Sequence, residues 1–190
     1  MTRVHHRARS AVSVPACRPW GLAAAIVMTM VGAGCVAAHG AHAEPSRFAP
    51  WPEAPTPALA LPDLAGRRHA LVDYRGKVVL INFWATWCEP CRDEMPSMQK
   101  LEERLRGQPF VILGVNHGEA ESRVREFAER MRIGFSLLVD PNQDSANAWR
   151  VRILPASFLV ARDGRVRYRV IGEMDWASDE AVSVVRALLR

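Results

Sequence analysis

A nearly unbroken apolar run, Lys77 to Trp84 (KVVLINFW), constrains the fold more than any other feature of the chain. Such a run, rich in β-branched and aromatic residues, is typical of a strand buried on both faces of a largely parallel sheet. A helix is predicted next, because apolar residues recur every three or four positions from Cys88 to Leu105. Its buried face would carry Cys88, Cys91, Met95, Met98, Leu101 and Leu105, with Pro96 inside the helix and Gly107 after it.

The rest of the domain alternates between segments typical of strands and segments with the three- to four-residue apolar spacing of helices. We expect a hairpin over 58–75, strands at 110–115, 135–139, 156–161 and 166–171, and helices at 119–131, 144–149 and from Ser178 onward. In the helix at 119–131 the inward residues would be Val124, Phe127, Ala128 and Met131. This order predicts an α/β fold with a central mixed β-sheet flanked by helices.

The amino-terminal segment has the pattern of a targeting sequence. Residues 1–19 are basic without acids, residues 20–38 carry no charge, and an Ala-His-Ala site ends at residue 43. Residues 1–43 are therefore expected to be a secretory signal peptide. The apolar run is also long enough for a membrane anchor over 20–38, and lipidation at Cys35 is a third possibility. All three place the domain outside the cytoplasm, in the periplasm or on the outer face of the cytoplasmic membrane.

Residues 44–57 contain five prolines and are interpreted as a stiff linker, or as the ragged start of a domain over 58–190. The formal charge of +5 does not indicate a nucleic-acid partner. Of the 25 Lys and Arg residues, four arginines precede the apolar run, which leaves 21 against 20 acids from Glu44 onward. A local cluster, Arg162, Arg165, Arg167 and Arg169, is expected to be a solvated strand face or edge.

The two cysteines of the domain stand where a strand leads into a helix. The unpaired N–H groups and partial positive charge of a helix N-terminus favour the thiolate of Cys88. Cys91 lies nearly one turn further on, so its sulfur can reach that of Cys88. Pro90 fits the first turn, where a helix needs no N–H partner. The arrangement predicts disulfide exchange, in which Cys88 attacks a substrate disulfide and the more buried Cys91 resolves the mixed disulfide.

Other uses of a C-x-x-C pair have less support in the sequence. A zinc site needs a second ligand pair, and the only histidines after residue 43 are His69 and His117. A purely structural bridge over so short a loop would stabilise little. No glycine-rich nucleotide loop occurs, so neither a cofactor nor a metal is expected.

The string N-F-W-A-T-W-C-E-P-C-R-D-E-M-P, residues 82–96, resembles the TlpA/ResA branch of the thioredoxin-like superfamily, over roughly residues 58–190. This resemblance implies a thioredoxin-like fold with an N-terminal β-hairpin extension, in which Trp87, Glu89 and Pro90 support the cysteines. It also implies a cis peptide bond at Leu154-Pro155 opposite the cysteines, where Pro155 aligns a bound substrate. Glu94 matches an acid of the active-site cleft that assists proton transfer, and the alternative is a solvated glutamate in the first turn of the helix.

The function implied by the resemblance is an extracytoplasmic disulfide reductase. Its clients would be apocytochrome c or copper-site cysteines, its electrons would come from a membrane thiol-relay donor, and a monomer is expected. Two residues depart from related patterns: Asn82 replaces the buried aspartate of thioredoxin, and Ala156 replaces an acid common in cytochrome-maturation members. The alternative is a copper carrier that uses the same cysteine pair with His117 as a third ligand. A peroxidase is disfavoured by Ala85 three residues before Cys88, and a strong oxidase by the acids Glu89 and Glu94.

Overall fold

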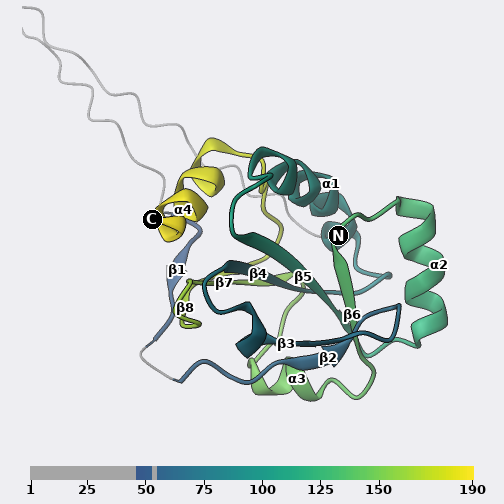
Figure 1. Cartoon of the computed structure of the whole chain (residues 1–190). Coiled ribbons are helices and arrows are strands. Elements are labelled where there is room, and N and C mark those ends of the chain that lie inside the picture. The colour runs from purple at the N-terminus through teal and green to yellow at the C-terminus, as the bar shows by residue number, and fades with distance from the viewer. Residues whose placement is uncertain (1–45, 53–54) are drawn as a thin grey trace, which may run out of the picture. The chain divides into compact units, whose positions relative to one another are not determined.

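A computed structural model describes residues 46–52 and 55–190 (Figure 1). The predicted signal peptide or anchor over residues 1–43, with Cys35, lies outside the described residues and stays a prediction. Within the two described ranges, no helix is both long and apolar enough to cross a membrane.

A six-stranded mixed sheet forms the centre of the domain, in the order β1-β8-β7-β4-β5-β6. Its strands are β1 (Ala49–Pro50), β4 (Val78–Trp84), β5 (Phe110–His117), β6 (Ser136–Asp140), β7 (Ala156–Val160) and β8 (Val166–Ile171). Every residue of β4 is buried, and β4 runs parallel to β5 and antiparallel to β7. The predicted buried strand and mixed sheet are therefore confirmed.

Helices cover both faces of the sheet (Figure 1). They are α1 (Glu89–Arg104), α2 (Glu121–Met131), α3 (Asp144–Ala148) and α4 (Asp179–Leu189). Successive β4 residues point to opposite faces, as a strand requires. Leu80 and Trp84 join a core with residues of α1, α2 and α4, whereas Ile81 and Phe83 join a second core with α3 and the hairpin segment. All six residues predicted for the inner face of α1 and its flanks are buried.

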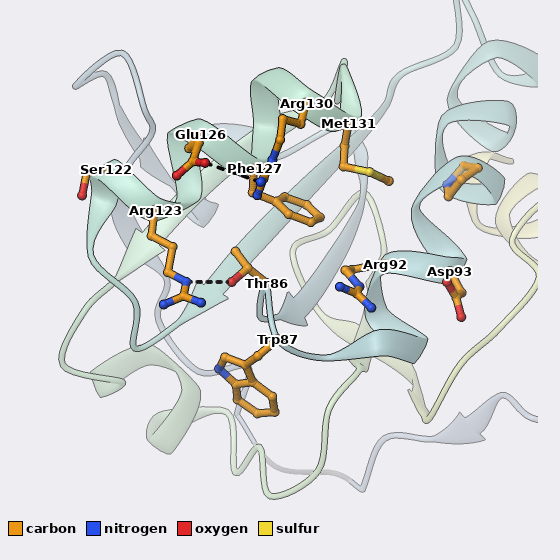
Figure 2. A pocket seen from close by; sticks show the side chains of 11 residues that line it. Thr86, Trp87, Arg92, Asp93, Ser122, Arg123, Glu126, Phe127, Arg130 and Met131 are labelled. Atoms are coloured by element: carbon orange, nitrogen blue, oxygen red, sulfur yellow. Dashed lines mark hydrogen bonds and ion pairs between the residues drawn. The ribbon is translucent and has the colours of Figure 1, made fainter.

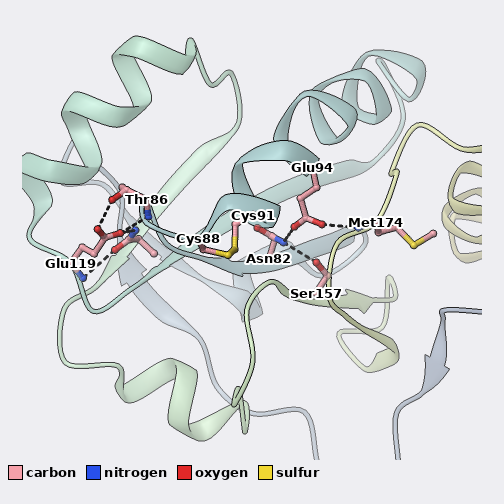
Figure 3. The surroundings of a disulfide bond; sticks show 9 residues. Asn82, Thr86, Cys88, Cys91, Glu94, Glu119, Ser157 and Met174 are labelled. Carbon is pink, nitrogen blue, oxygen red and sulfur yellow. Dashed lines mark hydrogen bonds between the residues drawn. A yellow bond between two sulfur atoms is a disulfide. The ribbon is translucent and has the colours of Figure 1, made fainter.

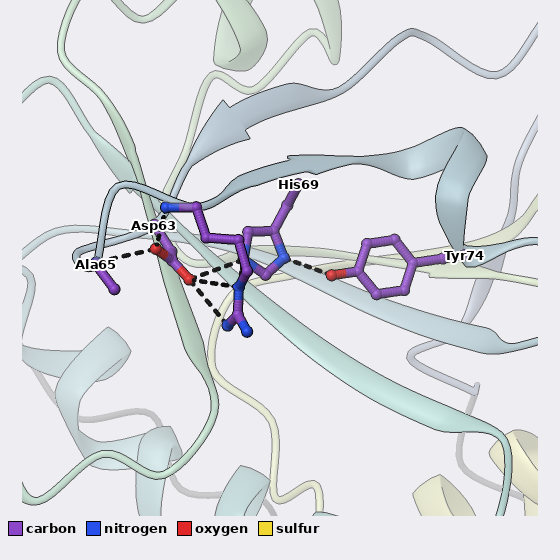
Figure 4. A network of polar contacts seen from close by, with 5 residues as sticks. Asp63, Ala65, His69 and Tyr74 are labelled. Carbon is purple, nitrogen blue, oxygen red and sulfur yellow. Dashed lines mark hydrogen bonds and ion pairs between the residues drawn. The ribbon is translucent and has the colours of Figure 1, made fainter.

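The predicted hairpin is confirmed as antiparallel β2 (Ala60–Pro62) and β3 (Arg68–Ala70), followed by the 3-10 helix η1 (Leu71–Tyr74). Asp63 in its turn accepts hydrogen bonds from the backbone N–H groups of Ala65 and Arg67, both at 2.9 Å (Figure 4). Its second oxygen pairs with the Arg67 guanidinium and lies 2.9 Å from His69 Nε2, while His69 Nδ1 contacts the Tyr74 hydroxyl. Burial opposes the ionised carboxylate, but these contacts outweigh it and hold the pKa of Asp63 at about 2.

Part of the segment predicted as a linker belongs to the sheet instead. Strand β1 pairs antiparallel with β8, and Phe48 just before it is only 5% exposed. The Phe48 ring packs edge-on against Tyr168 and Trp176, each at 6.0 Å between centroids, and Trp51 packs edge-on against Phe158. Residues 46–52 are thus packed on the sheet despite their prolines, because Phe48 is buried and the half-buried Trp51 also packs against the core.

The prediction of which α2 residues face inward is confirmed only in part. Val124 and Phe127 are buried and Ala128 is half-buried, but Met131 is 37% exposed and does not belong to the core. The helix ends directly after it, where Arg132 adopts a left-handed backbone conformation with φ of 51°. Met131 lies instead on the wall of an open groove described below. The four arginines of the 162–169 cluster are exposed, as predicted.

Candidate active site

Strand β4 delivers Cys88 to the start of α1. Cys88 has an extended backbone at the N-cap position, and Pro90 occupies the first turn of the helix. A disulfide joins Cys88 and Cys91 (Figure 3). Cys88 is 5% exposed and Cys91 is fully buried, in the order expected for an attacking and a resolving cysteine. Trp87, Glu89 and Pro90 are exposed around the pair, and Trp87 is 64% exposed.

The register of the sheet brings Pro155 to the same edge. Phe83 pairs with Ala156, so the residue before β7 lies beside the end of β4 that leads to the cysteines. Pro155 is buried, its peptide bond with Leu154 is cis, and its carbonyl oxygen accepts a 2.9 Å hydrogen bond from Gly172 N–H. The cis bond agrees with what the family resemblance implies.

Glu94 does not stand among the exposed residues of the motif. It lies three residues after Cys91 on the same face of α1, and it is only 2% exposed. Its Oε1 accepts a 2.6 Å hydrogen bond from Asn82 Nδ2, and its Oε2 accepts one of 3.1 Å from the Met174 backbone N–H (Figure 3). The same Asn82 amide also donates to Ser157 Oγ at 2.9 Å.

Burial raises the pKa of Glu94 to about 7, although the hydrogen bonds from Met174 and Asn82 act in the opposite direction. A carboxyl group with this pKa changes its protonation state near neutral pH, whereas an ordinary glutamate stays ionised there. Glu94 is therefore equipped to take up and release a proton in the pH range in which thiols exchange.

A second buried carboxylate lies on the other side of the disulfide, and the sequence analysis did not single it out. Glu119 follows β5 and is 9% exposed. Its oxygens accept hydrogen bonds from Thr86 N–H at 2.7 Å, Thr86 Oγ1 at 2.6 Å and Asn116 Nδ2 at 2.8 Å (Figure 3). The sequence did contain a signal for this residue, because the polar residues Asn116 and Glu119 stand at the end of a buried strand. Parallel strands have their carboxyl ends at one edge of a sheet, so these residues could have been expected near the cysteines.

Burial would raise the pKa of Glu119, but the hydrogen bonds from Asn116 and Thr86 and the charge of Arg123 together lower it below its ordinary value. The disulfide is thus flanked by two buried carboxyl groups with opposite pKa shifts (Figure 3). At neutral pH Glu119 is ionised, whereas Glu94 is present in both its protonated and its ionised form.

An open groove of about 1160 Å³ lies beside the cysteines, between the Thr86–Trp87 turn, the start of α1 and the length of α2 (Figure 2). Apolar groups from Trp87, Pro96, Phe127 and Met131 line it together with charged side chains. The charged residues are Arg92, Asp93, Arg123, Glu126 and Arg130. The groove can therefore accept an extended segment that carries both apolar and polar side chains.

A cysteine pair at a helix N-terminus, at the edge of a mixed sheet and beside a buried proline, defines a thiol–disulfide oxidoreductase of thioredoxin-like fold. Comparison with known proteins agrees. The sequence model of the AhpC/TSA family matches residues 52–169. The chain belongs to this family and, within it, to the ResA-like thiol–disulfide oxidoreductases.

Two curated relatives and one solved structure illustrate the likeness. The chain is 44% identical over 118 residues to the thiol-disulfide oxidoreductase ResA of Geobacillus thermodenitrificans, which covers 62% of this chain and 68% of the relative. It is 33% identical over 149 residues to ResA of Bacillus cereus, which covers 78% and 85%. A crystal structure described as a thiol:disulfide interchange protein DsbE from Chlorobium tepidum superposes with a TM-score of 0.66 at 28% identity, over 70% of this chain and 94% of that one.

Proposed function

We propose that the enzyme works as a disulfide reductase on client proteins outside the cytoplasm. The observation that carries the proposal is the position of Cys88, at a helix N-terminus beside the groove, with Cys91 fully buried behind it. Glu89 and the buried Glu94 near the pair oppose a very acidic Cys88 thiol, which supports a reducing rather than a strongly oxidising protein.

The exchange begins from the reduced enzyme. The Cys88 thiolate attacks one sulfur of a client disulfide, the client S–S bond breaks, and the departing client sulfur takes up a proton. Cys91 then loses its proton and attacks Cys88 Sγ, which breaks the mixed disulfide and releases the second client thiol. The client gains two electrons and two protons, and the enzyme ends with the Cys88–Cys91 disulfide that the structure contains.

Glu94 serves as the base in the second step. It shares a helix face with Cys91, and its pKa of about 7 suits a group that accepts a thiol proton and returns it when the enzyme is reduced again. Asn82 holds the carboxyl group in place through its 2.6 Å hydrogen bond. Because an amide does not titrate near neutral pH, the proton resides on Glu94.

The client segment lies between Trp87 and the Leu154–Pro155 bond, with its flank in the groove beside α2. Support comes from the exposed Trp87 ring, the open groove and the position of Pro155 at the same sheet edge. Glu89 and Pro90 form the start of the first turn of α1, directly after Cys88, and Pro90 supplies a first-turn residue without an N–H group.

The clients are apocytochrome c or a protein with copper-site cysteines, in which the enzyme reduces a disulfide to thiols. A membrane thiol-relay donor returns electrons to the Cys88–Cys91 pair. These assignments extend the family resemblance to this chain. A cleaved signal peptide or an anchor over residues 20–38 delivers the domain to the periplasm or the outer face of the membrane. No bound cofactor is needed, because the electrons move between sulfur atoms.

The copper-carrier alternative lacks a comparable observation. Among residues 46–52 and 55–190, no three His, Cys, Asp or Glu side chains are grouped so that they could hold a metal ion. His117 is the last residue of β5 and belongs to no such group. Titration of the reduced protein with Cu(I) separates the two functions, since a carrier would bind the ion stoichiometrically.

The reduction potential of the Cys88–Cys91 pair tests the proposal. The domain from residue 44 onward is equilibrated with thiol redox buffers, and the fraction of disulfide is read by alkylation and mass spectrometry. We expect a potential lower than about −200 mV, toward the roughly −270 mV of thioredoxin. A potential near the roughly −120 mV of DsbA would show that the protein oxidises its clients.

A further inference from the structure

We propose that Glu119 is a positioning residue for the exchange reaction, and that its ionised carboxylate holds the turn that carries Cys88 through both polar groups of Thr86. The proposal rests on thiol–disulfide exchange at Cys88 but not on its direction or its clients. Nothing in the C-x-x-C motif itself indicates this residue, which lies 31 positions beyond Cys88 in the sequence.

The first argument is the number of contacts made by one carboxylate. Oε2 accepts from Thr86 N–H at 2.7 Å and from Asn116 Nδ2 at 2.8 Å. Oε1 accepts from Thr86 Oγ1 at 2.6 Å and lies 3.3 Å from Arg123 Nε. Four donor groups therefore contact a carboxylate that is almost fully buried. Arg123 also donates to Thr86 Oγ1 at 3.2 Å (Figure 2).

The second argument is that only a carboxylate satisfies all of these donors. Each oxygen of Glu119 receives two contacts from N–H or O–H groups. In one orientation the NH2 group of a glutamine would face the N–H donors of Thr86 and Asn116. In the other it could donate to the Thr86 hydroxyl, but it would lose the contact with Arg123. The substitution therefore removes the charge and weakens the hold on Thr86, because a neutral amide oxygen accepts hydrogen bonds less strongly than a carboxylate.

The third argument is the place of Thr86 in the chain. It follows the buried end of β4 and lies two residues before Cys88, whose own N–H donates to the Ala85 carbonyl at 3.2 Å. Asn116 pairs with Trp84 across the strands, and Asn116 Oδ1 accepts from Glu119 N–H at 3.2 Å. The carboxylate therefore joins the turn to the end of β5, a rigid neighbour in the sheet, and fixes the direction from which Cys88 approaches a disulfide.

A series of variants tests the proposal. Glu119→Gln disrupts the network, Thr86→Val removes the hydroxyl contacts but keeps the backbone N–H bond, and Thr86→Ser keeps both. Asp63→Asn is the matched control, because Asp63 is a similarly buried, ionised carboxylate whose hydrogen-bond partners all lie in the β2–β3 hairpin segment. The reduced proteins react with glutathione disulfide, a small probe, well below their melting temperatures and over a range of pH.

We expect the second-order rate constant to fall about tenfold in Glu119→Gln and by a smaller factor in Thr86→Val, at every pH tested. Thr86→Ser should react like the wild type, and Asp63→Asn should lose stability without losing rate. Thr86→Val and Thr86→Ser decide the matter if Glu119→Gln does not fold.

The inference is overturned if folded Glu119→Gln or Thr86→Val reacts at the wild-type rate. It is also overturned if the rate constant falls with the melting temperature in all variants, the control Asp63→Asn included. A wild-type protein that does not react with the probe would overturn exchange at Cys88 altogether. A reactive wild type with a high reduction potential would remove the proposed reductase function and leave this inference standing.

Discussion

Asn82 Nδ2 lies 2.6 Å from Glu94 Oε1, so a strand residue of the central sheet holds the one carboxyl group that α1 buries behind the cysteines. The same NH2 group donates to Ser157 Oγ, which ties Glu94 to β7 as well as to β4. Where thioredoxin-like proteins can carry an acid on the strand, this chain has a neutral donor on the strand and the acid on the helix. The group that titrates near neutral pH is therefore Glu94 on α1 and not a residue of β4, and its protonation should be measurable.

Glu94→Gln should change how stability depends on pH. In the oxidised protein the cysteines do not titrate, and Glu94 has a pKa of about 7 when folded against an ordinary value of 4.5. The folded state then binds more protons than the unfolded state between these values, so the free energy of unfolding of the wild type falls as pH rises from about 4.5 to 7. Relative to Glu94→Gln, we expect the wild type to lose roughly 3 kcal/mol by pH 8.

Urea denaturation at pH 4, 6 and 8 measures this difference. Glu103→Gln, an exposed acid on the same helix, controls for the loss of one negative charge from α1. Parallel stability curves for the wild type and Glu94→Gln over this range would show that Glu94 does not titrate as described.

Cys91→Ser should trap the client. Without the buried second thiol, the mixed disulfide on Cys88 cannot be resolved, so it accumulates instead of the reduced client. Non-reducing electrophoresis and mass spectrometry of the adduct check this result. Cys88→Ser is the matched variant and should form little adduct, because Cys91 is fully buried; adducts of equal yield would reverse the assigned order of attack.

Phe48→Ala should destabilise the domain by about 3 kcal/mol, because the deleted ring fills a buried space between Tyr168 and Trp176. Thermal and urea unfolding measure the loss. Ile171→Ala, on the half-exposed face of β8, is the control and should change stability by less than about 0.5 kcal/mol. Equal effects in both variants would mean that residues 46–52 do not belong to the folded domain.

Gly114→Ala should also destabilise the domain, by about 1–3 kcal/mol through overpacking. A Cβ at this position of β5 would lie 2.8 Å from Leu137 Cδ2 and 3.1 Å from the Phe135 ring, both in the core. At Gly134 the nearest atoms are 3.9 Å away, so Gly134→Ala should be neutral or slightly stabilising. Guanidinium unfolding distinguishes the pair, and a neutral Gly114→Ala would show that the β5–β6 region can expand.

Local pattern was enough to predict the elements that carry the chemistry. The apolar run of β4 and the three- and four-residue spacing of α1 depend on neighbours in sequence, so they could be read without tertiary information. The same holds for Ser178, which caps α4 by accepting a hydrogen bond from Ala181 N–H.

Contacts between distant segments could not be read in this way. Strand β1 has two residues, one of them proline, and exists only because β8 pairs with it and Phe48 is buried. Glu119 stands where the pattern indicates the beginning of a helix, and only the register of β4 with β5 brings it to Thr86. Met131 fits the apolar period of α2 but lies beyond the point where the helix packs on the sheet.

The two outer strands of the sheet have a consequence for self-association. At one edge β1 is only two residues long and Pro50 has no N–H to offer, while the outer side of β6 is met by a bridge between Asp63 and Leu138. Within residues 46–52 and 55–190, neither β1 nor β6 presents a long row of free backbone groups to which another chain could add a strand. Strand addition by a second copy of the chain is therefore disfavoured at β1 and at β6, which limits self-association through the sheet.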